Sequence, residues 1–79
     1  MKFTIHTASI AHDRDGFATS EAFGDVVASF DADYPRAADA AGKALLQSIG
    51  VRVTGYVGSN DSVCCYGTDR GPLAVLVAV

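Results

Sequence analysis

The sequence predicts an α+β domain in which one helix packs across one face of an antiparallel β-sheet of about four to five strands. Apolar and polar residues alternate with a period of two before residue 31 and after residue 50, whereas residues 34–49 carry apolar side chains at helical spacing. The predicted order is two strands, one helix and three strands. The 79 residues contain no linker or repeat, so we expect a single domain, 1–79. A chain this short buries only about 60% of its unfolded surface, which leaves little room for a deep cleft.

The first predicted element is a strand over residues 2–10, with Phe3 and Ile5 on one face. The pair Asp15-Gly16 is a strong hairpin signal because both residues tolerate positive φ. A return strand is therefore expected within residues 17–31. Gly24 separates its two apolar stretches, which indicates either one long bent strand or two short strands.

The segment 34–49 has the clearest pattern in the chain. Asp31 and Asp33 precede it, where carboxylates can accept hydrogen bonds from free backbone amides, and Pro35 suits the first turn. Gly50 stands where a left-handed residue commonly follows a helix. The pattern predicts a buried stripe made of Ala38, Ala41, Leu45 and Ile49, widened by Leu46.

Three short strands are predicted after residue 50, in "VRVTGYV", "SVCCYG" and "LAVLVAV". The last of these, residues 73–79, is apolar on both faces. It is therefore either a central strand covered on its second side or an edge strand that meets another chain. The second alternative predicts a homodimer.

Several functional classes are disfavoured. No apolar run is long enough for a membrane span or a signal peptide, so a cytoplasmic protein is expected. Cys64 and Cys65 are adjacent and would point to opposite faces of a strand, which favours free thiols in a reducing compartment. His6 and His12 lack the paired spacings of a zinc site, and a catalytic pair of His6 with a cysteine is a minor alternative. We expect no enzyme, no cofactor and no metal site, since phosphate-binding glycine motifs are also absent.

Acidic residues concentrate in the first half of the chain. Residues 11–39 hold seven acidic and two basic side chains, a net charge of −5, whereas the remainder carries +2. Direct nucleic-acid binding needs a basic stripe, so an acidic face indicates a basic protein partner instead. A solvated surface with no partner is the equally simple alternative. Because Asp31 and Asp33 are expected to cap the helix, the predicted partner-binding residues are Asp13, Asp15, Glu21, Asp25 and Asp39.

In its size, acidic bias and element order, with the Ala-rich segment "RAADAAGKALLQSIG" and a C-terminal strand set containing "CYGTDRG", the chain resembles small phage-encoded anti-CRISPR proteins of type I systems. The resemblance implies an inhibitor that binds a crRNA-guided surveillance complex and blocks target DNA binding. It implies no catalytic residues. The alternative is a small antitoxin-like or regulatory domain that dimerises through residues 73–79.

Overall fold

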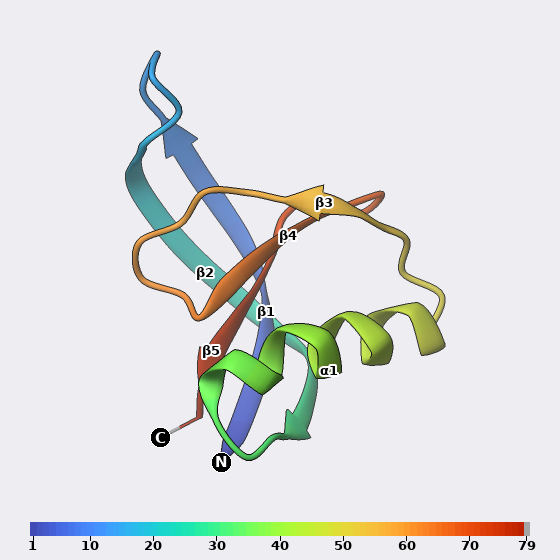
Figure 1. Ribbon diagram of the computed structural model, residues 1–79. Coiled ribbons are helices and arrows are strands. Elements are labelled where there is room, and N and C mark those ends of the chain that lie inside the picture. The colour runs from blue at the N-terminus through green and yellow to red at the C-terminus, as the bar shows by residue number, and fades with distance from the viewer. Residues whose placement is uncertain (79) are drawn as a thin grey trace.

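The computed structural model describes residues 1–78, which form a five-stranded antiparallel sheet and one helix (Figure 1). The elements are β1 (Lys2–His12), β2 (Ala18–Asp31), α1 (Pro35–Ser48), β3 (Val53–Tyr56), β4 (Cys64–Thr68) and β5 (Leu73–Val77). The strands lie in the order β2-β1-β5-β4-β3, and every neighbouring pair is antiparallel. The predicted α+β class, with one helix on an antiparallel sheet, is confirmed.

Strands β1 and β2 form a hairpin that is longer than the rest of the sheet. β5 pairs with β1 only from Phe3 to Thr7, so the remaining half of β1 pairs with β2 alone. This distal half of the hairpin extends beyond the other strands, toward the top of Figure 1. The hairpin therefore presents much of its length to solvent.

The return strand is one long, irregular strand rather than two short ones. Ile5 pairs with Ala28 and His6 with Val26, which leaves Val27 without an opposite residue. A second irregularity follows between His6 and Ala8, and Gly24 falls within it. A Cβ atom at Gly24 would overlap the Thr7 hydroxyl, so a larger residue there would have to displace this exposed side chain.

The helix begins and ends almost where its pattern predicts, but the capping of its N-terminus and its buried stripe differ from the prediction. Tyr34 is the N-cap residue, no side chain caps the helix, and the proposed capping by Asp31 and Asp33 is wrong. Pro35 occupies the first turn, where its missing N–H costs nothing. Gly50 has a φ of 87°, as expected for a left-handed residue that ends a helix.

The buried face of α1 is formed by residues four positions apart: Ala38, Gly42 and Leu46. Ile49 is 46% exposed because it is the C-cap residue, beyond the last helical turn, so its place in the predicted stripe was wrong. Small residues at positions 38 and 42 let the helix lie close to the sheet. The core between helix and sheet consists of Phe3, Ile5, Ala38, Leu46, Val51, Tyr66, Leu73 and Val75.

Strand β5 is a central strand, flanked by β1 and β4. Leu73, Ala74 and Val75 are all buried, which confirms that both faces of this strand are covered. In its described part, the segment 73–79 therefore has no free strand edge with which a second copy could pair. Val79 lies outside the described residues. A homodimer therefore remains a prediction, but an exposed edge of this strand is no longer a reason for it.

Within residues 1–78, no helix has both the length and the apolar character that crossing a membrane requires.

Candidate partner-binding surface

The tip of the β1–β2 hairpin is a turn organised by Asp13. Its Oδ1 atom accepts hydrogen bonds from the backbone N–H groups of Asp15, at 2.9 Å, and Phe17, at 3.0 Å. Gly16 has a φ of 87°, which few L-residues adopt, so the predicted glycine turn is confirmed. Asp13 therefore shapes the turn, and the carboxylate of Asp15 stays exposed.

The same tip exposes an aromatic ring. Phe17 is 71% exposed, the largest exposed fraction among the big apolar side chains of the described chain. It lies two residues from Asp15, so a negative charge and an apolar ring are presented together. Exposed aromatic residues at protein surfaces often serve as anchors in protein interfaces.

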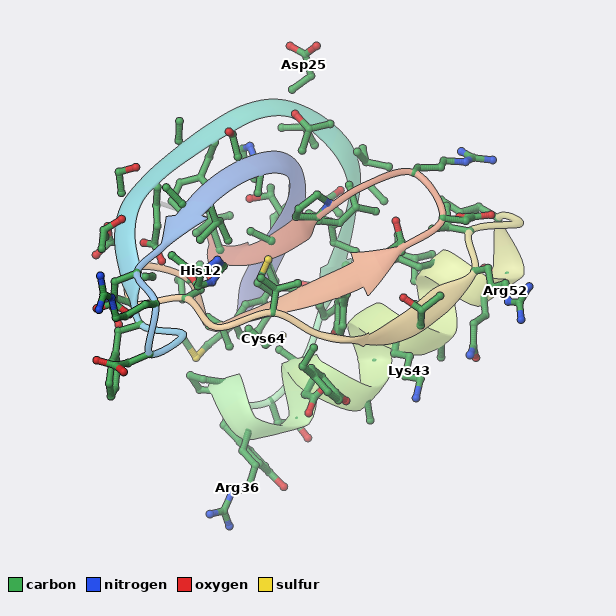
Figure 2. All side chains as sticks on the ribbon, turned by 90° about the horizontal axis from the view of Figure 1, so that it is seen from above. His12, Asp25, Arg36, Lys43, Arg52 and Cys64 are labelled. Atoms are coloured by element: carbon green, nitrogen blue, oxygen red, sulfur yellow. The ribbon has the colours of Figure 1, made fainter. Side chains whose placement is uncertain are left out.

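Farther along β2, the irregular pairing turns consecutive residues toward solvent. Gly24, Asp25, Val26 and Val27 are all exposed, with Val26 at 57% and Val27 at 37%. In a regular strand, alternate residues would face the sheet interior. Figure 2 shows Asp25 projecting away from the ribbon, well separated from Lys43 and Arg52, which lie on the side of α1 and the segment after it.

Glu21 has a different role, since its carboxylate binds the loop between β3 and β4. It accepts hydrogen bonds from the Ser59 hydroxyl at 2.7 Å, from the backbone N–H of Asn60, and from that of Asp61 at 2.8 Å. The hydrogen bond from Ser59 is the main cause that holds the pKa of Glu21 below its ordinary value. The neighbouring carboxyl group of Glu21 raises the pKa of Asp61. Glu21 thus fastens the loop to the hairpin.

Two further contacts tie this loop to the hairpin. His12 Nε2 lies 2.8 Å from the carbonyl oxygen of Gly58, to which a protonated Nε2 donates. The side-chain amide of Asn60 donates to the Ala18 carbonyl at 3.1 Å. His12 therefore helps to hold the loop against the hairpin.

Asp39 is also engaged within the fold. Its Oδ1 atom accepts a hydrogen bond from the Tyr56 hydroxyl at 2.9 Å, and its backbone carbonyl accepts one from the Tyr66 hydroxyl at 2.5 Å. The bond to Asp39 is the main cause that raises the pKa of Tyr56. The two tyrosine rings lie 5.8 Å apart between their centroids. Asp39 therefore joins α1 to β3 and β4.

The five predicted partner-binding acids thus fall into two groups. Glu21 and Asp39 are half-buried and form hydrogen bonds inside the molecule, whereas the other three are exposed on the hairpin. Within residues 1–78, the carboxylates of Asp15 and Asp25 form no hydrogen bond. Asp13 and Asp15 lie in the turn between β1 and β2 and Asp25 lies on β2, and the structure does not gather all five acids on one face.

Sequence reasoning missed the apolar part of this surface, formed by Phe17, Val26 and Val27. The signal that identifies the two valines was present, because Gly24 indicated an irregular strand, and irregular pairing breaks the inside-outside alternation. Phe17 follows a predicted turn, where a large apolar side chain has no core position to occupy.

Of the residues considered for catalysis, His6 is hydrogen-bonded through both ring nitrogens, Cys65 is buried and Cys64 is half-buried. The Nδ1–H of His6 donates to the Gly24 carbonyl at 2.9 Å, and its Nε2 accepts from the Thr4 hydroxyl at 2.8 Å. Burial raises the pKa of the Cys65 thiol to about 11 and also raises that of Cys64. Both thiols are free. A thiol that stays protonated at neutral pH is a weak nucleophile.

Among residues 1–78, no group of three or more His, Cys, Asp or Glu side chains is arranged to hold a metal ion. Comparisons of the chain with protein-family models, curated proteins and solved structures gave no match.

Proposed function

We propose that this protein is a non-enzymatic inhibitor that binds stoichiometrically, through the β1–β2 hairpin, to a cationic surface with which another protein holds nucleic acid. The resemblance to anti-CRISPR proteins makes a type I CRISPR surveillance complex the proposed partner, with loss of target DNA binding as the outcome. The observation that carries the proposal is the exposure, on the β1–β2 hairpin, of Asp15 beside Phe17 at the tip and of Asp25 beside Val26 and Val27 farther along β2.

The exposed carboxylates and apolar side chains of the hairpin are not needed to hold the fold together. Neither Asp15 nor Asp25 makes a side-chain hydrogen bond among the described residues, and the three apolar side chains lie outside the core. Carboxylates attract the Lys and Arg side chains that otherwise neutralise phosphates, which speeds association. Apolar side chains add short-range affinity when they are desolvated against a partner. Together they suit a competitor of nucleic acid.

The partner is sought by affinity capture from a host lysate with the double variant Asp15→Lys/Asp25→Lys as the comparison. The control is Asp33→Lys/Asp69→Lys, which changes the net charge equally at exposed positions outside the hairpin. Because Asp69 Oδ1 accepts a hydrogen bond from the Arg52 N–H at 3.2 Å, thermal unfolding of the control checks that it remains folded. We expect the wild-type protein and the control to retain a nucleic-acid-binding complex that the hairpin variant loses. Equal capture by all three proteins, or capture of no such complex, would overturn the proposal.

A further inference from the structure

The sheet has two faces, and α1 packs on only one of them. The core between helix and sheet includes Tyr66, Leu73 and Val75. Their sequence neighbours Cys65 and Ala74 pair with each other and point to the second face, because successive residues of a strand alternate. Cys65 and Ala74 are 2% and 0% exposed, although they lie outside the core beneath the helix. Another part of the chain therefore covers the second face.

The distal half of the β1–β2 hairpin supplies part of this cover. His6 of β1 pairs with Ala74, so its side chain lies on the second face. Farther along β1, the same face carries Ala8 and Ile10, which are half-buried, whereas the alternate residues 7, 9 and 11 are exposed. Figure 2 shows the strong curvature of β1 and β2. Beyond Ile5, β1 therefore packs through the second face.

The loop between β3 and β4 closes the second face from the other side. Val57 donates its backbone N–H to the Cys65 carbonyl at 2.9 Å, so the chain leaves β3 beside this residue. Residues 58–62, which we call the clasp loop, then reach across to the hairpin. Within residues 1–78, the hydrogen bonds from the clasp loop to other segments all end on the hairpin, at His12, Ala18 and Glu21. The clasp loop therefore connects the two edges of the sheet, β3 and β2.

Glu21 is the main anchor of the clasp loop. Its carboxylate accepts hydrogen bonds from the Ser59 hydroxyl and from two backbone N–H groups, and hydrogen bonds to an ionised acceptor are stronger than those between neutral groups. The carboxylate also lies near the covered face, since burial, the charge of Cys64 and the charge of Glu21, in decreasing order, raise the pKa of Cys65. A segment held by so few contacts opens at a lower free-energy cost than the whole domain.

We propose that the clasp loop and the distal hairpin form a clasp over the second face of the sheet, which opens as a local unit when the Glu21 anchor is lost, while the helix-facing core stays closed. Opening exposes Cys65 but not Cys64, because Cys64 packs against the core between helix and sheet. The two adjacent thiols therefore report on the two faces separately. This device does not depend on which partner the hairpin binds.

The test measures how fast each thiol of the whole protein reacts with N-ethylmaleimide, an uncharged reagent. Cys64→Ala leaves Cys65 as the reporter, and Cys65→Ala leaves Cys64. In these two backgrounds, Glu21→Ala should speed the reaction of Cys65 at least about tenfold and leave that of Cys64 nearly unchanged. The control Asp33→Ala removes the same charge at an exposed position outside the hairpin and should change neither rate.

A second variant, Ser59→Ala/Asn60→Ala, loosens the same loop while the charge of Glu21 stays in place, and it should also speed the reaction of Cys65. It carries the test if Glu21→Ala does not fold. Backbone amide exchange in β5 checks that the helix-facing core remains closed. Equal acceleration of both thiols, or faster exchange in β5, would show global destabilisation and overturn the proposal. An unchanged rate at Cys65, or acceleration in Glu21→Ala but not in Ser59→Ala/Asn60→Ala, would also overturn it, because the charge rather than opening would then change the thiol.

Discussion

Gly42 lies in the middle of α1 where the helix crosses the sheet, and its replacement by alanine tests the packing of helix on sheet. In an unrestricted helix this change stabilises by about 0.8–1.0 kcal/mol, because glycine loses more backbone freedom on folding. Here a Cβ atom would lie 2.8 Å from the Tyr66 hydroxyl and 3.3 Å from Cζ of Phe30. Tyr66 is fully buried and its hydroxyl donates to the Asp39 carbonyl, so it has little room to move.

The cost of this overlap outweighs the gain. Forcing an extra carbon into a packed core costs about 1–3 kcal/mol, and displacing the Tyr66 hydroxyl weakens a hydrogen bond worth about 0.5–1.5 kcal/mol. Gly42→Ala should therefore destabilise by about 1–2 kcal/mol, which lowers Tm by roughly 4–15 °C in a domain of this size. The exposed position 40 supplies the matched control, since Ala40→Gly measures the helix propensity of α1 without a packing change.

Urea denaturation and calorimetry of Gly42→Ala, Tyr66→Phe and the double variant distinguish packing from propensity. Without the hydroxyl, the new methyl group meets only the ring of half-buried Phe30, so Gly42→Ala should become neutral or stabilising in the Tyr66→Phe background. Stabilisation by Gly42→Ala in the wild-type background, or the same loss in both backgrounds, would show that overlap with the Tyr66 hydroxyl does not determine the effect.

Three further predictions follow from single features. Gly16→Ala should lower the free energy of unfolding by about 1 kcal/mol, because this position has a positive φ and no neighbouring atom that a methyl group would meet. Gly55→Ala, at a position with the same open space but no positive φ, should be nearly neutral. Equal effects of the two changes in urea denaturation would show that backbone strain at Gly16 is not the cause. Because the pKa of Glu21 is lowered in the folded state, its ionised form stabilises the protein above its ordinary pKa of 4.5, and this stability is lost as pH falls through the lowered value. Glu21→Gln should therefore be less stable than wild type at neutral pH, and the difference in stability should narrow as pH falls below 4.5. A difference that does not change with pH would show that the charge is not responsible. Cys65→Ala should lower the free energy of unfolding by about 1 kcal/mol and Cys64→Ala by less, since only Cys65 is fully buried. Both thiols should react slowly with a thiol reagent at neutral pH, because their pKa values are raised. Rapid modification of the native protein would contradict the raised pKa values.

Local sequence patterns predicted most of the secondary-structure elements. Pro35 and Gly50 marked the helix, and Asp15-Gly16 marked the hairpin, because each acts through its own backbone preferences. The apolar run from residue 73 left two alternatives open, since periodicity alone does not say which neighbours a strand has. In the structure this segment forms β5, a central strand between β1 and β4, and Ala74 is buried.

The binding surface was only partly predictable. Counting charges correctly drew attention to the first half of the chain, but it treated every carboxylate as equivalent. Glu21 reaches a loop 38 residues away in the sequence, and Asp39 meets Tyr56 across the helix–sheet boundary. These are long-range contacts with no local signature. The outward turn of Val26 and Val27 depends on the register between β1 and β2, which a single strand pattern does not specify.

We propose that the exposed hairpin competes with nucleic acid for a cationic surface of its partner. The most direct measurement is target-DNA binding by purified type I surveillance complexes, titrated with the wild-type protein, with Asp15→Lys/Asp25→Lys and with Asp33→Lys/Asp69→Lys. We predict that wild type and the control abolish DNA binding by at least one complex near stoichiometric amounts, and that the hairpin variant requires at least about tenfold more protein. DNA binding that is unaffected by the wild-type protein, or that is blocked equally well by the hairpin variant, would show that the hairpin does not act by this competition.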